Sequence, residues 1–114
     1  EGGDDQLEGG SGTDLLVGGA GTDRIYGFSV GGGGDDNTRD LIYGDFGDGT
    51  AGGARDFLYG QGGDDEIHGE DGDDEIQGGG GADLIYGDLG EDLVQGGLGA
   101  DTIYGGGGRD TLYG

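Results

Sequence analysis

Single aliphatic residues recur along the chain at a fixed distance after an Asp. In eleven places an Asp is followed two residues later by Leu, Ile or Val, and most successive Asp residues of this set are nine residues apart. The intact units read Gly-Gly-x-Gly-x-Asp-x-aliphatic-x, for example residues 9–17 and 78–86. Self-similarity at a fixed period is typical of repeat architectures, in which each unit packs against its neighbours.

The two parts of each unit predict different backbone conformations. The first six residues favour a turn, because Gly takes positive φ without steric cost. The last three predict a short strand with its aliphatic side chain on one face. Two units then form one coil with a strand on each side, and stacked coils give two parallel sheets that face each other. The predicted core is the set of inward aliphatic residues: Leu7, Leu16, Ile25, Ile42, Leu58, Ile67, Ile76, Ile85, Val94, Ile103 and Leu112.

Two intervals between repeats are longer, at 17 and 16 residues. They correspond to one unit with eight and one with seven additional residues, which lie within residues 27–39 and 44–55. The strand part of the repeat resumes after each of them. We therefore interpret both segments as enlarged loops on a single solenoid that spans residues 1–114.

The composition excludes several classes of protein. The chain has 37 Gly, 20 Asp and 6 Glu against four Arg, with no Lys, Cys or Pro, and its formal net charge is -22. So few basic residues exclude a nucleic-acid binder, and the absence of Pro excludes collagen. The absence of Cys excludes thiolate metal sites, and the scattered apolar residues exclude a membrane-spanning helix. Low hydrophobicity with high charge is typical of disorder, so an ordered fold depends on the repeat.

Stacking the repeats brings the Asp residues of successive coils together. Adjacent strands lie about 4.8 Å apart, and carboxylates at that spacing repel one another. The aliphatic residues of so short a repeat do not offset this repulsion and the ordering of a Gly-rich backbone. The sequence therefore predicts that cations lie between the Asp rows.

The nonapeptide resembles the repeat of the RTX family, the hemolysin-type calcium-binding repeats. The resemblance covers essentially the whole chain apart from the two longer segments. It implies an all-β fold, a right-handed parallel β-roll in which Ca2+ ions are stacked between the turns of adjacent coils. It also implies that each turn supplies an Asp carboxylate together with backbone carbonyls from its second and fourth positions.

Carried onto this chain, the resemblance assigns two kinds of calcium ligand. The carboxylates are Asp5, Asp14, Asp23, Asp40, Asp56, Asp65, Asp74, Asp83, Asp92, Asp101 and Asp110. The carbonyls are those of Gly10, Gly12, Gly19, Gly21, Gly63, Glu70, Gly72, Gly79, Gly81, Asp88, Gly90, Gly97, Gly99, Gly106 and Gly108. Carbonyl ligation explains why the second position can also hold Gln61, Glu70 or Asp88.

The chemistry of the residues agrees with calcium. Ca2+ takes six to eight oxygen ligands, whereas transition metals prefer the N and S ligands that one His and no Cys cannot supply in number. Pairing each Asp with the one two units further gives nine turn pairs, and nine Ca2+ ions would offset most of the net charge of -22. Asp40 and Asp56 lack the usual Gly two residues before them, and Asp35 or Asp36 could replace Asp40 as a ligand.

Other features favour structural roles. The six Tyr all occupy the ninth position, which faces outward, and β-propensity explains them better than a binding stripe does. His68 is expected to be a surface residue rather than a ligand or catalytic base. A G-x-G-x-x-G match at residues 47–52 is accidental because it opens no helix. No triad or zinc-protease spacing is present, so we expect no enzyme activity in this segment.

The sequence predicts a calcium-binding structural module that folds when it meets calcium outside the cell. The resemblance implies a secreted bacterial protein exported by a type I system. One alternative is a unit of an extracellular polymer, adhesin or surface layer, with other copies joined end to end. Another is an accessory module that adjoins the catalytic or toxic domain of a secreted protein.

Overall fold

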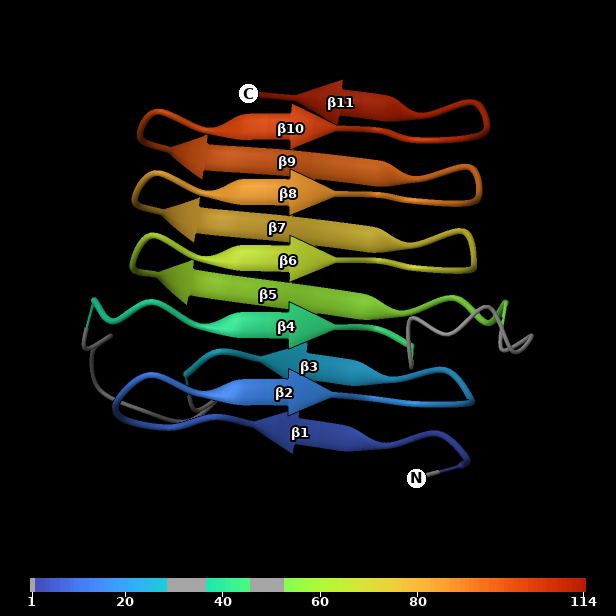
Figure 1. Ribbon diagram of the computed structural model, residues 1–114, viewed down its shortest axis with the longest axis horizontal. Helices are drawn as coiled ribbons and strands as arrows, with labels where there is room; N and C mark the ends of the chain where they lie inside the picture. Colours follow the sequence, from blue (N-terminus) through green and yellow to red (C-terminus); the bar gives the residue numbers. More distant parts are fainter. Residues whose placement is uncertain (1, 29–36, 46–52) are drawn as a thin grey trace.

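The computed structural model describes residues 2–28, 37–45 and 53–114, and these form eleven strands (Figure 1). No helix is found among the described residues, and so none that could span a membrane. The strands are β1 (Gln6–Glu8), β2 (Leu15–Val17), β3 (Arg24–Tyr26), β4 (Leu41–Tyr43), β5 (Phe57–Gly62), β6 (Glu66–His68), β7 (Glu75–Gly80), β8 (Leu84–Tyr86), β9 (Leu93–Leu98), β10 (Thr102–Tyr104) and β11 (Thr111–Tyr113).

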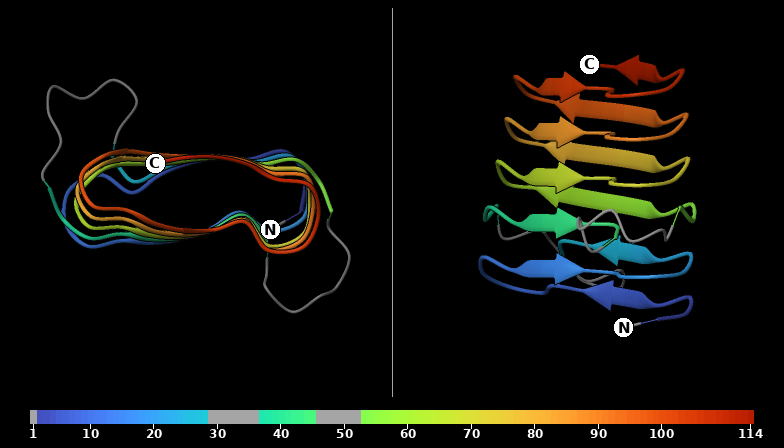
Figure 2. Two further views of the ribbon diagram at one scale, coloured as in Figure 1. Left: turned by 90° about the horizontal axis from the view of Figure 1, so that it is seen from above. Right: turned by 45° about the vertical axis from the view of Figure 1, so that its right-hand side comes forward.

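Alternate strands belong to different sheets. One sheet has six strands in the order β1-β3-β5-β7-β9-β11, and the other has five in the order β10-β8-β6-β4-β2. Every pairing is parallel and matches equivalent positions of the repeat, as in Ile76 with Val94 and Ile67 with Ile85. Seen from above, the coils superimpose on one flattened outline (Figure 2). The predicted two-sheet parallel β-roll is confirmed.

Three strands are longer than predicted. β5, β7 and β9 have six residues each and continue into the segment that the repeat predicts to be a turn. There Gln61 pairs with Gly79 and Gly62 with Gly80. The second and third positions of these units thus continue the pairing between coils, although Gln61 and Gly79 have positive φ angles of 76° and 112°.

The core is the predicted double row of aliphatic side chains between the sheets. Seven of them are fully buried, at 0 % exposure: Ile25, Ile42, Leu58, Ile67, Ile76, Ile85 and Val94. Leu16 is buried at 8 %, and Leu7 and Ile103 are partly buried against the cluster. Leu112 is 45 % exposed because β11 is the last strand of its sheet and has a neighbour on one side only.

The stack continues in register across both interrupted intervals. Leu16 pairs with Ile42, and Ile25 with Leu58, each aliphatic position on its equivalent. Much of the two inserted segments, residues 29–36 and 46–52, lies outside the described residues, as does the G-x-G-x-x-G match. The role of these segments as loops on one domain stays a prediction.

Replacing Ile85 with Ala should lower the free energy of unfolding of the calcium-saturated chain by about 2–5 kcal/mol, because the side chain is fully buried between the sheets. The neighbouring Leu84→Ala is the matched control. Leu84 is only half-buried on the outer face, so its replacement should cost about 1 kcal/mol or less. Thermal unfolding followed by circular dichroism measures both, and equal losses would contradict the assigned inward and outward faces.

Candidate metal centre

The Asp residues of successive coils are linked directly. In each of the nine predicted turn pairs, the backbone N–H of one Asp donates a hydrogen bond to Oδ1 of the Asp in the next coil, at 2.8–3.2 Å. Asp74, for example, donates to Oδ1 of Asp92 at 2.9 Å and accepts from Asp56 at 2.9 Å. One oxygen of each carboxylate is therefore used to join coils.

In six of these carboxylates the second oxygen lacks such a partner among the described residues. Oδ2 of Asp14, Asp23, Asp56, Asp74, Asp83 and Asp92 is buried, and within the described part of the chain it receives no hydrogen bond. Burying a carboxylate oxygen without a donor is costly unless a cation or a proton neutralises it. These oxygens mark the places where positive charge is needed.

The first Gly of each unit makes room for this oxygen. A Cβ on Gly69 would lie 2.6 Å from Oδ2 of Asp74 and 2.6 Å from the carbonyl oxygen of Gly87 in the next coil. Gly78 repeats this arrangement with Asp83 and Gly96. The first position is Gly because the carboxylate folds back over its own turn, at a distance that no side chain could tolerate.

The fourth position needs Gly for a different reason. Gly72 and Gly90 have φ angles of 141° and 147°, which L side chains rarely adopt. The carbonyl oxygen of Gly72 faces Gly90 of the next coil so closely that a Cβ on Gly90 would overlap it. The predicted carbonyl ligands of this position thus recur in a row beside the Asp row.

The second position tolerates other residues. Gln61, Glu70 and Asp88 have φ angles of 72–76°, in the left-handed helical region that a non-Gly residue can enter at a modest cost. The carbonyl of Glu70 accepts a hydrogen bond from the Leu89 N–H at 2.8 Å, so it already joins two coils. A carbonyl oxygen has a second lone pair, so the same oxygen can also ligate a cation. Calcium ligation by the second position stays a prediction.

In the two units without the usual fourth Gly, a carbonyl takes the equivalent place although the residue lacks the positive φ of Gly72 and Gly90. Thr38 and Ala54 stand two residues before Asp40 and Asp56, and their carbonyls face Gly63 and Gly72 of the next coil. Asp40 and Asp56 are themselves buried, at 4 % and 0 % exposure. The alternative ligands Asp35 and Asp36 lie outside the described residues.

Burial raises the pKa of several of these carboxyls. The pKa of Asp74 rises to about 8, that of Asp56 to about 7 and that of Asp92 to about 6, first because of desolvation and then because of neighbouring carboxylates, while the backbone N–H bond lowers it. The pKa of Asp23 and Asp83 is raised for the same first reason. Without a cation, the middle of the row would carry protons near neutral pH.

Oxygen atoms form the interior of these turns. The predicted ligand sets contain carboxylates and carbonyls alone, which suits a hard cation of variable coordination such as Ca2+ better than Zn2+ or Cu2+. Asp23, Asp40, Asp56, Asp65, Asp74, Asp83 and Asp92 are buried, Asp14, Asp101 and Asp110 are half-buried, and Asp5 is exposed. The donor set fits calcium, and most completely in the central coils.

Two groups of Asp were missed by the sequence analysis. Asp64 and Asp73, at the fifth position, accept hydrogen bonds from the N–H groups of Ala82 and Glu91 in the next coil, both at 2.8 Å. The Asp-Asp pairs at 64–65 and 73–74 were the available signal. Asp45 at the second position is buried at 6 % exposure, and the interrupted repeat around it obscured its equivalence to Glu70 and Asp88.

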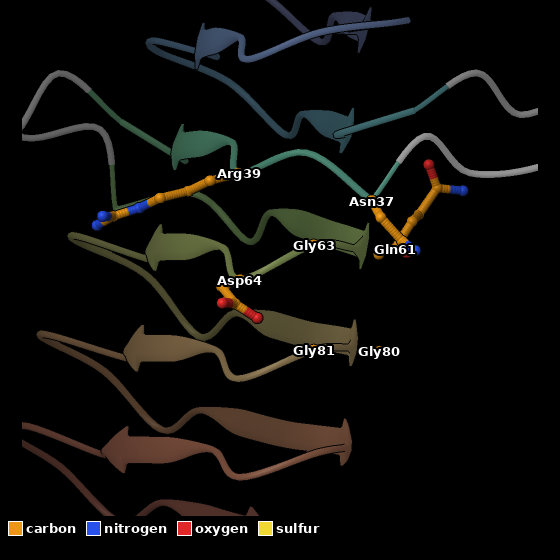
Figure 3. A pocket seen from close by; sticks show the side chains of 8 residues that line it. Asn37, Arg39, Gln61, Gly63, Asp64, Gly80 and Gly81 are labelled. Atoms are coloured by element: carbon orange, nitrogen blue, oxygen red, sulfur yellow. The ribbon is translucent and has the colours of Figure 1, made fainter.

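A groove also crosses the turns beside the first inserted segment (Figure 3). Glycine backbone at positions 62–63 and 80–81 forms much of it, together with Asn37 and Gln61. Its two charged side chains make other contacts, since Arg39 pairs with Glu66, and Oδ1 of Asp64 accepts from Ala82. We assign no ligand to this groove.

Fold and site together define a parallel β-solenoid whose turns hold stacked, buried carboxylates in need of cations. The family model of the RTX calcium-binding nonapeptide repeat matches the sequence four times, at residues 1–27, 50–85, 59–94 and 86–114. These matches cover more than half of the chain, and the chain belongs to this family of calcium-binding repeats. Comparison with curated proteins and with solved structures gave no match.

Replacing Asp74 with Asn should reduce the number of bound calcium ions, because Asp74 borders two neighbouring turn pairs. Each lost site lowers the free energy of unfolding by about 1.4 kcal/mol at a tenfold excess of calcium over its Kd. Calorimetric titration gives the stoichiometry. Asp71→Asn removes the same charge from the third position of the same turn, and calcium loss equal in both variants would contradict the assignment.

Acid should partly replace calcium. The folded pKa values of Asp56 and Asp74, about 7 and about 8, exceed their ordinary value of 3.8, so the folded state binds more protons between these limits. The stability this gives is complete below about pH 4 and is lost as the pH rises through about 7 to 8. In metal-free buffer we expect the strand signal in circular dichroism to grow on acidification from about pH 8.5 to 4.5. A signal that grows with rising pH would contradict the burial of these groups.

Proposed function

We propose that this calcium-binding repeat module is a folding switch, disordered where calcium is scarce and ordered as a β-roll where calcium is abundant. This proposal is carried by the buried Oδ2 atoms that receive no hydrogen bond from the described part of the chain, those of Asp14, Asp23, Asp56, Asp74, Asp83 and Asp92. In the absence of cations, folding would bring these charges together inside a chain with a net charge of -22. The unfolded chain keeps the same carboxylates hydrated and apart.

The coils are coupled, so the switch is expected to be cooperative. Each Asp of the rows from Asp23 to Asp92 accepts from one neighbouring coil and donates to another, and the sheets pair each coil only with its neighbours. An ion between two turns therefore orders both coils and prepares the next site, as in other solenoids with nearest-neighbour coupling. Up to nine ions could bind, one for each linked turn pair.

The surroundings that suit such a switch are extracellular. Extracellular calcium sites commonly have Kd values of about 10⁻⁴–10⁻³ M, far above the calcium concentrations at which cytosolic buffer proteins bind. Membership of the RTX repeat family supports a secreted bacterial protein, and a chain unfolded at low calcium would suit passage through a type I exporter. In this proposal the module is a structural part of a secreted protein and carries no catalysis of its own.

Calcium titration tests the switch. In excess chelator the far-ultraviolet circular dichroism should show no strand signal, and calcium in the millimolar range should restore it in one cooperative transition. Light scattering should report a smaller hydrodynamic radius in the same range.

Mg2+ at equal concentration and ionic strength is the control, because it demands a strict octahedron and retains its waters. It should restore much less of the signal. Full strand content in chelator at neutral pH, or an equal response to Mg2+, would refute the proposed switch.

A further inference from the structure

A second cluster of ligand-type side chains lies outside the Asp rows. His68 ends β6, Glu70 is at the second position of the following unit, and Asp88 is its equivalent in the next coil. One ligand atom from each of these residues lies within 4.8 Å of the other two. The cluster therefore combines an imidazole and two carboxylates from two adjacent coils.

The imidazole of His68 is held in a fixed orientation. Its ring is stacked between those of Tyr43 and Tyr86, with centroids 4.8 and 4.7 Å away, and the side chain is 19 % exposed. The expectation of a simple surface residue is therefore incomplete, because most of the ring is covered. Stacking on both faces allows the two ring nitrogens to point only along the sheet surface.

The two nitrogens of His68 have different neighbours. Nε2 lies 3.3 Å from Oε1 of Glu66, and Nδ1 lies 3.5 Å from Oδ2 of Asp88. Both neighbours are carboxylates, which only accept when ionised; the tautomer that donates from Nε2 makes the shorter contact, the one at hydrogen-bond distance, to Glu66. The lone pair of Nδ1 then faces Asp88, and a carboxylate on the far nitrogen is the usual way in which a metal-binding His is oriented.

In this tautomer Nδ1 and Oδ2 of Asp88 would repel each other unless a cation lies between them. Oδ2 of Asp88 is buried and receives no hydrogen bond from the residues that the structure describes. In a tetrahedral site with ligand bonds of about 2.1 Å, two ligand atoms are about 3.4 Å apart. The observed separation of 3.5 Å between Nδ1 and Oδ2 matches this edge.

We propose that His68 Nδ1, Glu70 and Asp88 bind one divalent transition-metal ion, of which Zn2+ is the representative. An imidazole and two carboxylates are ligands of zinc-type sites, and three protein ligands leave a fourth position for water. The ion uses the side chains of Glu70 and Asp88, whereas the predicted calcium ligands at these positions are carbonyls. It joins one coil to the next on the outside of the roll, as a staple independent of the calcium rows.

Zinc titration of the calcium-saturated chain tests this site. Calcium in excess keeps the β-roll folded and its turns occupied, so isothermal calorimetry should detect one Zn2+ per chain. His68 is the single His of the sequence, which makes its ring signals in ¹⁵N-correlated NMR unambiguous. Zn2+ should shift the resonance of Nδ1 and leave Nε2 protonated.

Substitutions separate this site from general binding to acidic groups. His68→Phe keeps a flat ring in the stack but removes both nitrogens, and Asp88→Asn keeps the backbone carbonyl. Each should weaken Zn2+ binding about tenfold or more, and His68→Phe should retain calcium-dependent folding. Glu75→Gln removes one carboxylate charge from the opposite sheet and should leave Zn2+ binding unchanged.

Two results would overturn the proposal. One is the absence of Zn2+ binding to the calcium-saturated chain; two protonated ring nitrogens would then show that an imidazolium neutralises the cluster. The other is Zn2+ binding that His68→Phe leaves unaltered, which would place the metal on acidic groups elsewhere.

Discussion

The molecule depends on neutralising carboxylates that are buried one above another. The Asp side chain joins coils through Oδ1, which accepts the N–H of the preceding Asp, and this bond fixes Oδ2 inside the turn. This arrangement stabilises the folded state only when positive charge lies beside the buried Oδ2 atoms. The aliphatic rows give the roll its interior, but they are thin, with one side chain per strand. Whether the coils stack is therefore decided in the turns, and calcium is the cation that their oxygen donors suit.

The same constraint explains the glycines, which serve separate purposes. Gly69 is Gly because the carboxylate of Asp74 lies where a Cβ would stand, and Gly72 because its φ of 141° is closed to other residues. At the second position the φ angle can fall to about 72–76°, and there Gln61, Glu70 and Asp88 appear. Side chains at this position lie beside the turns, half-buried at Glu70 and Asp88 and buried at Asp45. The repeat is thus strict where oxygen atoms crowd and permissive where its surface can acquire a further role.

Much of this could be predicted from the sequence because the repeat encodes its own register. The phase of Asp and aliphatic residues was enough to predict the two parallel sheets, the buried row from Ile25 to Val94 and the nine linked turn pairs, even across the interrupted intervals. The spacing of Asp and aliphatic residues does not predict where the backbone carbonyls lie. That Thr38 and Ala54 would supply the carbonyl of the missing Gly depends on backbone path, not on residue type. Side chains that meet across coils, such as His68 and Asp88, are 20 positions apart and fit no motif.

The inside and the outside of the roll therefore differ in how they respond to substitution. Inside, an Asp contacts the coils before and after it, so a change at Asp74 reaches two turn pairs and weakens the stack as a whole. Outside, each contact adds only a small, local contribution to stability, because solvent screens it. Examples are the ring stack of Tyr86 on Tyr104, at 5.1 Å, and the ion pair of Arg55 with Glu75, at 2.9 Å. Cooperative folding and a variable surface can then coexist in one short repeat. Under the proposed switch, the calcium rows determine whether the roll forms, and the proposed zinc site is an example of what the outward positions of the formed roll add.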